Sequence, residues 1–123
     1  MNDQNQKNKY DLEERTAKFG EAVILLVRKL KSDHISRPLI TQLVKSATSI
    51  GANYMEANGA ESKKDFLHKI NICKKEARET KHFLRMVATS NPEITEQFRI
   101  LRKEAHELTL IFGAITRTPK GYQ

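Results

Sequence analysis

The sequence predicts an all-α protein, an up-down-up-down antiparallel four-helix bundle that occupies residues 11–117 as one domain. Apolar residues recur at alternating steps of three and four in four segments, which is the spacing of amphipathic helices that pack side by side. No stretch shows the sustained alternation and β-branched enrichment of a strand. Short polar breaks separate the segments, so consecutive helices are expected to be antiparallel neighbours. Residues 1–10 and 118–123 lack the repeat and are expected to be mobile tails.

The first helix is predicted from Leu12 to Lys31. Ile24 and Leu25 lie off its apolar stripe, and two large apolar residues on a second face indicate contact with a neighbouring subunit. The stripe itself consists of Phe19, Val23, Leu26 and Leu30.

The second helix is predicted to start with Ser36 as N-cap and Arg37-Pro38 in the first turn, where a missing proline N–H costs nothing. Beside its apolar stripe lies a polar stripe that is either a buried network fixing register, with Arg78 or Lys81 opposite, or a solvated edge. A structural role is favoured over a catalytic one, because this helix carries no histidine. The apolar stripe is Leu43, Ala47, Ile50, Tyr54 and Ala57, and the polar stripe is Ser46, Ser49, Asn53 and Glu56.

The third and fourth helices are delimited by local signals. Asn58-Gly59 ends the second helix with residues that tolerate positive φ, and Ser62 to Asp65 resembles a capping box for the third. Asn91-Pro92 supplies a stop and a new start. The third apolar stripe is Phe66, Ile70, Cys73, Ala77, Thr80, Leu84 and Val87, and the fourth is Ile94, Phe98, Leu101, Ala105, Leu108, Phe112 and Ile115.

Composition limits the compartment and the class of partner. The single cysteine, Cys73, has no disulfide partner in the chain, so it is expected to be a small apolar filler in a cytoplasmic protein. The longest apolar run, Ala22 to Val27, is too short to cross a membrane. The chain has 22 Lys and Arg against 15 Asp and Glu, a formal charge of +7, and more than half of the excess falls between Glu61 and Thr89. This balance is compatible with nucleic acid and equally with a need for solubility.

The third helix also carries a basic stripe. Its side chains repeat about 5 to 6 Å apart on one helix face, close to the phosphate spacing of a nucleic-acid strand. The alternative is an ordinary solvated face, in which lysine and arginine stems cover the core while their charged ends stay in water. The stripe consists of Lys74, Arg78, Lys81 and Arg85, and Lys63, Lys64 and Lys69 extend the positive region toward the helix start.

Motifs of catalysis are scarce. The chain has no glycine-rich phosphate loop, CxxC pair, HExxH or nucleophile elbow. Glu79 and His82 match the Glu-x-x-His spacing of di-iron bundles, but such a centre needs a second copy of the motif, which the chain lacks. His68 and His106 have no ligand spacing around them and are expected to be solvated or hydrogen-bonded. We therefore expect no metal, no cofactor, no small-molecule substrate and no enzymatic activity.

Four strings within residues 46–80 resemble one family. They are SATSIGAN, EA, SKKDFLHK and KEARET, and they are similar to the four-helix-bundle proteins named for intervening sequences inserted in bacterial 23S rRNA genes. The resemblance extends from Phe19 to Thr116. Members are cytoplasmic bundles without recognised enzymatic activity, and they are similar to the accessory variability proteins of diversity-generating retroelements. The family label reflects the location of the genes and does not imply membership of the ribosome.

The resemblance implies a homopentamer that binds nucleic acid through basic surface, because the retroelement proteins form such rings. Lys45 stands where family members commonly have arginine, which keeps the charge but loses the planar fork that binds a phosphate with two hydrogen bonds. At His82-Phe83 only one aromatic of a common pair remains. The leading hypothesis is a non-enzymatic, oligomeric bundle that binds RNA or DNA with low sequence selectivity. The alternatives are a protein-interaction scaffold whose basic charge is incidental, and a metal-dependent enzyme that uses Glu79 and His82.

Overall fold

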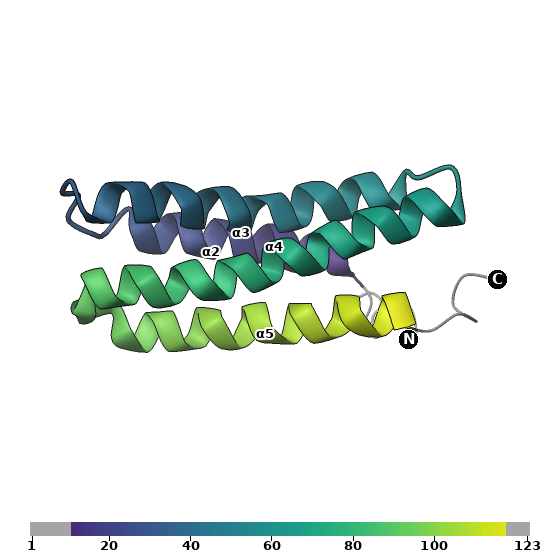
Figure 1. Ribbon diagram of the computed structural model, residues 1–123. Coiled ribbons are helices and arrows are strands. Elements are labelled where there is room, and N and C mark those ends of the chain that lie inside the picture. The colour runs from purple at the N-terminus through teal and green to yellow at the C-terminus, as the bar shows by residue number, and fades with distance from the viewer. Residues whose placement is uncertain (1–10, 118–123) are drawn as a thin grey trace.

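The computed structural model describes residues 11–117, which form four α-helices and one short 3-10 helix (Figure 1). The predicted all-α, up-down-up-down four-helix bundle is confirmed, and no strand occurs between residues 11 and 117. The segments predicted as tails, 1–10 and 118–123, lie outside the described residues. The elements are α2 (Leu12–Val27), α3 (Ser36–Asn58), α4 (Lys63–Ser90), η1 (Pro92–Ile94) and α5 (Thr95–Arg117).

Helix α2 ends earlier than the sequence predicted. Asp11 caps its start, because the Asp11 side chain accepts a hydrogen bond from the Glu14 backbone N–H at 3.1 Å. The helix ends at Val27, and the N–H of Leu30 bonds the Val27 carbonyl at 3.1 Å in a tighter turn. Leu30 still packs against the core, so the apolar spacing continues through a turn that is no longer α-helical. This continued spacing is why the sequence predicted a longer helix.

The predicted N-cap of α3 is wrong. Ser36 lies inside the helix, and Asp33 caps instead: its carboxylate accepts from the backbone N–H of Ser36 at 2.7 Å and of Ile35 at 3.0 Å. The bond from Ser36 is the main reason that the pKa of Asp33 is lowered. The Ser36 hydroxyl is buried and bonds the Ser90 hydroxyl at 2.6 Å. It ties α3 to the end of α4, a role that local sequence does not reveal.

The other helix junctions follow the predicted signals with one change. Helix α3 ends at Asn58 as predicted, but Gly59 has φ −95°, so the turn uses no left-handed residue. The Gly59 N–H instead bonds the Glu56 carbonyl at 3.1 Å. Ser62 caps α4 as predicted and accepts from the Asp65 N–H at 3.0 Å. After Asn91 the chain makes the 3-10 helix η1 before α5 begins.

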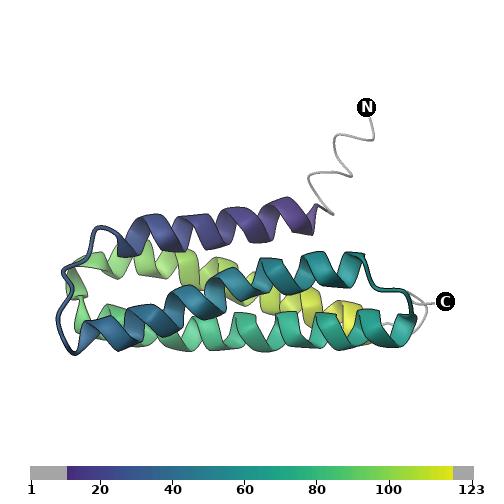
Figure 2. The ribbon, with the colours of Figure 1, turned by 90° about the horizontal axis from the view of Figure 1, so that it is seen from above.

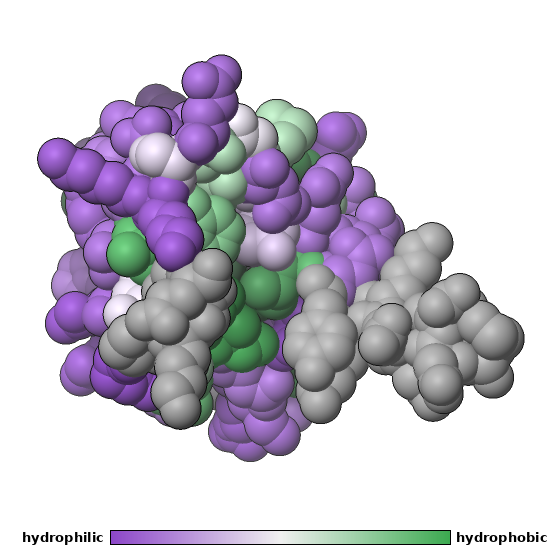
Figure 3. Space-filling model, turned by 90° about the vertical axis from the view of Figure 1, so that its right-hand side faces the viewer, coloured by the Kyte–Doolittle hydropathy of each residue, from purple (hydrophilic) through white to green (hydrophobic). Residues whose placement is uncertain are grey.

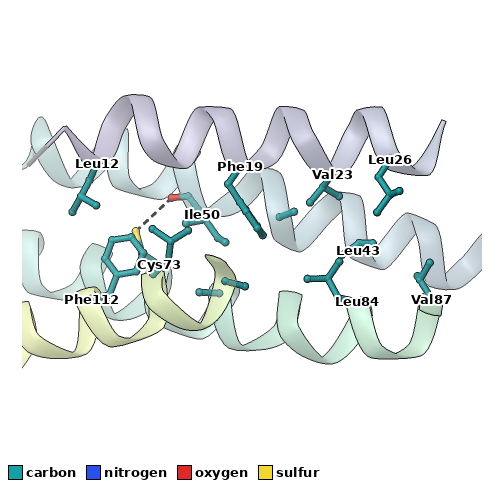
Figure 4. Packing of buried hydrophobic residues seen from close by; sticks show 14 of the residues in the cluster. Leu12, Phe19, Val23, Leu26, Leu43, Ile50, Cys73, Leu84, Val87 and Phe112 are labelled. Carbon is teal, nitrogen blue, oxygen red and sulfur yellow. Dashed lines mark hydrogen bonds between the residues drawn. The ribbon is translucent and has the colours of Figure 1, made fainter. Parts of the chain in front are cut away.

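The four predicted apolar stripes meet in one core (Figure 4). Cys73 belongs to it as a fully buried filler, and its thiol donates to the Ile50 carbonyl at 3.6 Å. Burial raises the pKa of Cys73 to about 12, so the thiol is unreactive in the folded protein. Seen from the end where α2 begins, apolar surface lies in a central band between hydrophilic residues (Figure 3). Fully or almost fully buried members include Val23, Leu43, Ile50, Ile70, Leu84, Leu108 and Phe112.

The helices do not pack equally closely around the bundle. Contacts are extensive from α2 to α3, from α3 to α4 and from α4 to α5, but α2 and α5 make few (Figure 2). Small residues let α3 approach α2: a Cβ at Gly51 would lie 3.2 Å from the Thr16 hydroxyl. Arg15 of α2 bridges the looser boundary through Glu104 and Glu107 of α5. The bundle is therefore closed on three sides and comparatively open between α2 and α5.

Candidate nucleic-acid interface

The basic stripe of α4 borders α5. Arg78 and Arg85 are exposed, whereas Lys74 and Lys81 are half-buried because they lean toward the neighbouring helix. Lys81 Nζ lies 2.9 Å from Nδ1 of His106 on α5. An ammonium group can only donate, so Nδ1 accepts and the proton of the neutral imidazole is on Nε2. His106 is therefore hydrogen-bonded, as the sequence predicted for a histidine that has no other metal-ligating residue at a suitable spacing.

Two contacts show how α4 and α5 pass each other. Lys74 lies beside Gly113, where an added Cβ would be 3.8 Å from Lys74 Cδ, and Lys81 contacts His106. Because the helices are antiparallel, the same register brings Arg85 level with Arg102. Arg85 of the predicted stripe therefore lies opposite a further basic residue, which sequence reasoning did not include.

A groove of about 510 Å³ runs along this boundary, and we call it the basic groove. Among residues 11–117, four cationic side chains line it and no carboxylate does. The missed members are Arg99, Arg102 and Lys103, all on α5. Their signal was present in the sequence, since Arg99 follows Phe98 and Arg102 follows Leu101, just as Lys81 follows Thr80. The lining residues are Lys81, Thr95, Phe98, Arg99, Arg102, Lys103 and His106.

The charges of α5 are divided between its two flanks. Glu104 lies on the α2 side, where its two carboxylate oxygens accept from Arg15 at 2.7 and 2.9 Å, and Glu107 accepts from the same guanidinium at 2.9 Å. The bond from Glu104 is the main reason that the pKa of Arg15 is raised. These carboxylates balance the segment's charge count without neutralising the basic groove, which explains why counting by segment missed it.

The cations of the groove are largely unpaired. Arg99 lies 3.5 Å from Glu96, but both side chains are 72% exposed, and ion pairs so exposed contribute little. Within residues 11–117, Lys81, Arg102 and Lys103 have no carboxylate within ion-pair distance. Their charges are available to an anionic partner.

Two lysines predicted to contribute to nucleic-acid binding, Lys69 and Lys45, lie elsewhere. Lys69 faces α3 and pairs with Glu56 at 2.6 Å. Lys45 of α3 lies near Glu76, whose pKa is raised by burial and then by Glu79, while Lys75 and Lys45 oppose that shift. Both therefore belong to the α3 side of α4, away from the basic groove. The spacing of basic residues along one helix does not reveal which of them face the helix on one side and which face the helix on the other.

The lysines at the start of α4 are remote from the groove. Lys63 and Lys64 are exposed in the first turn. At 1.5 Å per residue they lie about 25 Å along the helix from Lys81. They can extend a positive surface but do not line the groove.

The polar stripe of α3 makes structural hydrogen bonds. Ser46 is buried and accepts from Thr80 of α4 at 3.0 Å. Ser49 and Asn53 bond carbonyls of their own helix, Lys45 O at 2.7 Å and Ser49 O at 2.8 Å. Glu56 is exposed and bonds Lys69, so the suggested partners Arg78 and Lys81 are wrong. Those two side chains lie toward α5 and the outer face of α4, away from this stripe.

Glu79 and His82 lie on the outer face of α4. Both are exposed, and His82 packs edge-on against Phe83 at 5.1 Å between ring centroids. They border a shallow depression with Lys74, Lys75 and Arg78 rather than with further ligands. Across residues 11–117, no three His, Cys, Asp or Glu side chains converge as a metal site requires. The geometry gives the metal-enzyme alternative no support.

The apolar residues predicted to contact another subunit are exposed. Leu25 is 63% and Ile24 37% exposed. Leu25 follows Ala22 by three residues, so it shares the side of α2 that forms one wall of a second groove of about 510 Å³ between α2 and α5. Phe19, Ala22, Ile100 and Leu101 provide its apolar lining. Between residues 11 and 117, no helix is both long and apolar enough to cross a bilayer.

Comparison with known proteins identifies related sequences. The model of a family described as 23S rRNA-intervening sequence protein matches residues 8–114. The chain is also similar to a protein with unknown function from the S23 ribosomal protein family of Bacteroides thetaiotaomicron VPI-5482, solved by crystallography at 1.70 Å resolution. That match has a TM-score of 0.76 and 29% sequence identity, and it covers 86% of this chain and 98% of the other. No curated protein matches the chain.

Proposed function

This chain belongs to the 23S rRNA-intervening sequence protein family, and from that premise we propose that it is a non-enzymatic, oligomeric bundle that binds RNA or DNA through the basic groove. The observation that carries the proposal is the division of charge on α5. Arg99, Arg102 and Lys103 line the groove beside Lys81, whereas Glu104 is engaged by Arg15 on the opposite flank. A groove that, in the described part of the chain, is lined by four cations and no carboxylate complements the charge of a phosphodiester chain.

The proposed binding has low sequence selectivity. Lysine and arginine contacts to phosphates set affinity and register but carry no base information. The family's description names no enzymatic activity, which agrees with a binding role. We place the protein in the cytoplasm, because its single buried cysteine suits a reducing compartment.

The test is the salt dependence of binding to a fluorescent oligonucleotide. Four phosphate contacts predict a slope of about −3 for log affinity against log salt with a single strand. The double variant Arg102→Glu with Lys103→Glu should bind more than tenfold more weakly at low salt, because it reverses two of the groove's charges. The matched control, Lys29→Glu with Lys31→Glu, makes the same change in net charge in the exposed connection between α2 and α3 and should lose no more than about threefold.

Binding that ignores salt, or that both double variants weaken equally, would contradict the proposal. A pull-down with this protein from its native host, with and without nuclease, distinguishes nucleic-acid binding from the alternative function, a protein-interaction scaffold. Nuclease-sensitive recovery supports nucleic-acid binding. Nuclease-resistant recovery of one protein partner would favour the interaction scaffold.

We propose further that copies of the chain meet through the α2/α5 face, with the pentamer that the resemblance implies as the expected assembly. Leu25 and Ile100 are 63% and 62% exposed on either side of the open boundary. Such side chains, beside a groove lined by Phe19 and Leu101, form the kind of apolar surface that a neighbouring copy covers.

Light scattering after size-exclusion chromatography tests the assembly. Leu25→Asp combined with Ile100→Asp should dissociate it, because a carboxylate would be buried without a partner at each contact. Met55→Asp is a single-site control, since Met55 is 58% exposed on α3, a helix that contributes no residue to the α2/α5 groove within residues 11–117. A monomeric wild-type protein would contradict the proposed assembly.

A further inference from the structure

The basic groove contains an aromatic side chain that phosphate binding does not explain. Phe98 is half-buried: one side packs against the core and another lines the groove among Arg99, Arg102 and Lys81. A phenyl ring offers nothing to a phosphate, but it offers a flat apolar surface to a nucleobase. We infer that the basic groove takes single-stranded nucleic acid, with an unpaired base stacked on Phe98 and the flanking phosphates held by the surrounding cations.

The inference rests on the proposed function and narrows its substrate class. In a duplex the phosphates lie outside and the bases are stacked on each other, so a duplex can reach the exposed cations but cannot place a base on Phe98. In a single strand each base has a free face. The groove volume of about 510 Å³ falls within the range of small-ligand sites, so the groove can accommodate a nucleotide.

The ring is held in place before any ligand arrives. Phe98 contacts the core from one side, so its side chain loses little freedom when a base stacks on the other. On the same helix, Arg99 and Arg102 follow it by one and four residues, so both cations lie next to the ring, on its C-terminal side along α5. A stacking surface next to a row of cations is the arrangement found in single-strand-binding sites.

The remaining polar atoms of the groove suit the same ligand. Lys81 occupies Nδ1 of His106, which leaves the Nε2–H as a donor for a phosphate or base oxygen. The Thr95 hydroxyl donates to the Pro92 carbonyl at 2.7 Å, so its oxygen remains an acceptor for a base amino group. The groove thus provides donors for the backbone, one aromatic surface and one acceptor near it.

The experiment compares a short single strand with the duplex of the same sequence, at equal phosphate concentration and low salt. Wild-type protein should bind the single strand roughly five- to a hundredfold more tightly, the range that one stacked base contributes. Phe98→Leu keeps an apolar residue against the core and should reduce single-strand binding to the level of the duplex while duplex binding stays unchanged. Circular dichroism and thermal unfolding of the variant confirm that the bundle is intact.

A second measurement uses wild-type protein only. A single strand carrying 5-iodouracil should form a photochemical cross-link on the peptide that contains Phe98, because this base reacts with an aromatic ring stacked on it. Equal binding of single strand and duplex, with both lost in Arg102→Glu/Lys103→Glu, would overturn the inference and leave the proposed function intact. A single-strand preference that survives Phe98→Leu, or a cross-link elsewhere, would also overturn it, and absence of all binding would overturn both.

Discussion

The two flanks of α5 differ in how closely they pack, in their charge and in the kind of partner they could bind. Toward α4 the helices pack closely, and Lys81, Arg102 and Lys103 remain without carboxylate partners within residues 11–117. Toward α2 the contacts are few, and Arg15 is held by Glu104 and its neighbour. One helix with nearly balanced charge thus borders a positive groove and an apolar one. The difference teaches that the position of a charge around a helix decides its function more than the sum along the segment.

The largest expected effect tests whether α5 is held by its inward face rather than by either flank. Leu108→Ala should lower the free energy of unfolding by about 2–5 kcal/mol, because Leu108 is fully buried and its removal leaves a cavity. Leu110→Ala, two residues away and 55% exposed, should change it by no more than about 0.5 kcal/mol. Urea unfolding followed by circular dichroism measures both. Similar losses for the two leucines would mean that α5 is held differently.

The next prediction extends the comparison to the flanks of α4. Lys81→Gln with Arg85→Gln should weaken oligonucleotide binding roughly tenfold at low salt, since two charges beside the basic groove are lost. Lys45→Gln with Lys69→Gln removes the same charge from the α3 side and should weaken binding less than threefold. Fluorescence anisotropy at one salt concentration compares the pairs. Equal losses would show that net charge, not its location, drives binding.

Most of the fold was predictable because burial imposes a regular period on each helix. Cys73, Thr80 and Leu84 recur at the predicted steps and are all buried. Helix ends were less predictable: Ser36 has the sequence context of an N-cap, but its hydroxyl bonds Ser90, which is 54 residues away. Local sequence cannot signal a cap residue that is recruited by another helix.

The candidate site was only half predictable for a related reason. An apolar stripe shows which face of a helix points inward, but its two flanks are equivalent until the order of neighbours is known. Lys69 and Lys81 therefore seemed to share one surface, although one faces α3 and the other α5. Arg102 was hidden because Glu104 balances it in the count while binding Arg15 on the opposite flank.

A smaller effect is expected at the looser boundary of α5. A double-mutant cycle with Arg15→Ala and Glu104→Ala should give a coupling free energy of about 0.5–1 kcal/mol, because both side chains are roughly one-third exposed and water screens the pair. The coupling should shrink as salt is added. Urea unfolding of the four proteins at two salt concentrations measures it. A coupling of several kcal/mol would show that this boundary is as closed as the others.

The smallest expected effect gives the sharpest test of the comparison, because the variant raises the net charge of the protein without changing a residue that lines the basic groove. Glu104→Gln with Glu107→Gln removes two negative charges from the α2 flank of α5. In the wild-type protein both carboxylates accept hydrogen bonds from Arg15. If the groove's own cations determine affinity, oligonucleotide binding should rise less than about twofold at moderate salt, because both carboxylates are already engaged by Arg15 on the other flank and salt weakens what remains of their field. In this double variant Arg15 keeps its charge but loses its charged acceptors. Adding Arg15→Gln lowers the net charge by one again, so the triple variant serves as the control for net charge. A tenfold gain in affinity would mean that the two flanks of α5 act as one electrostatic surface, and the division that separates the positive groove from the apolar one would then have no functional consequence.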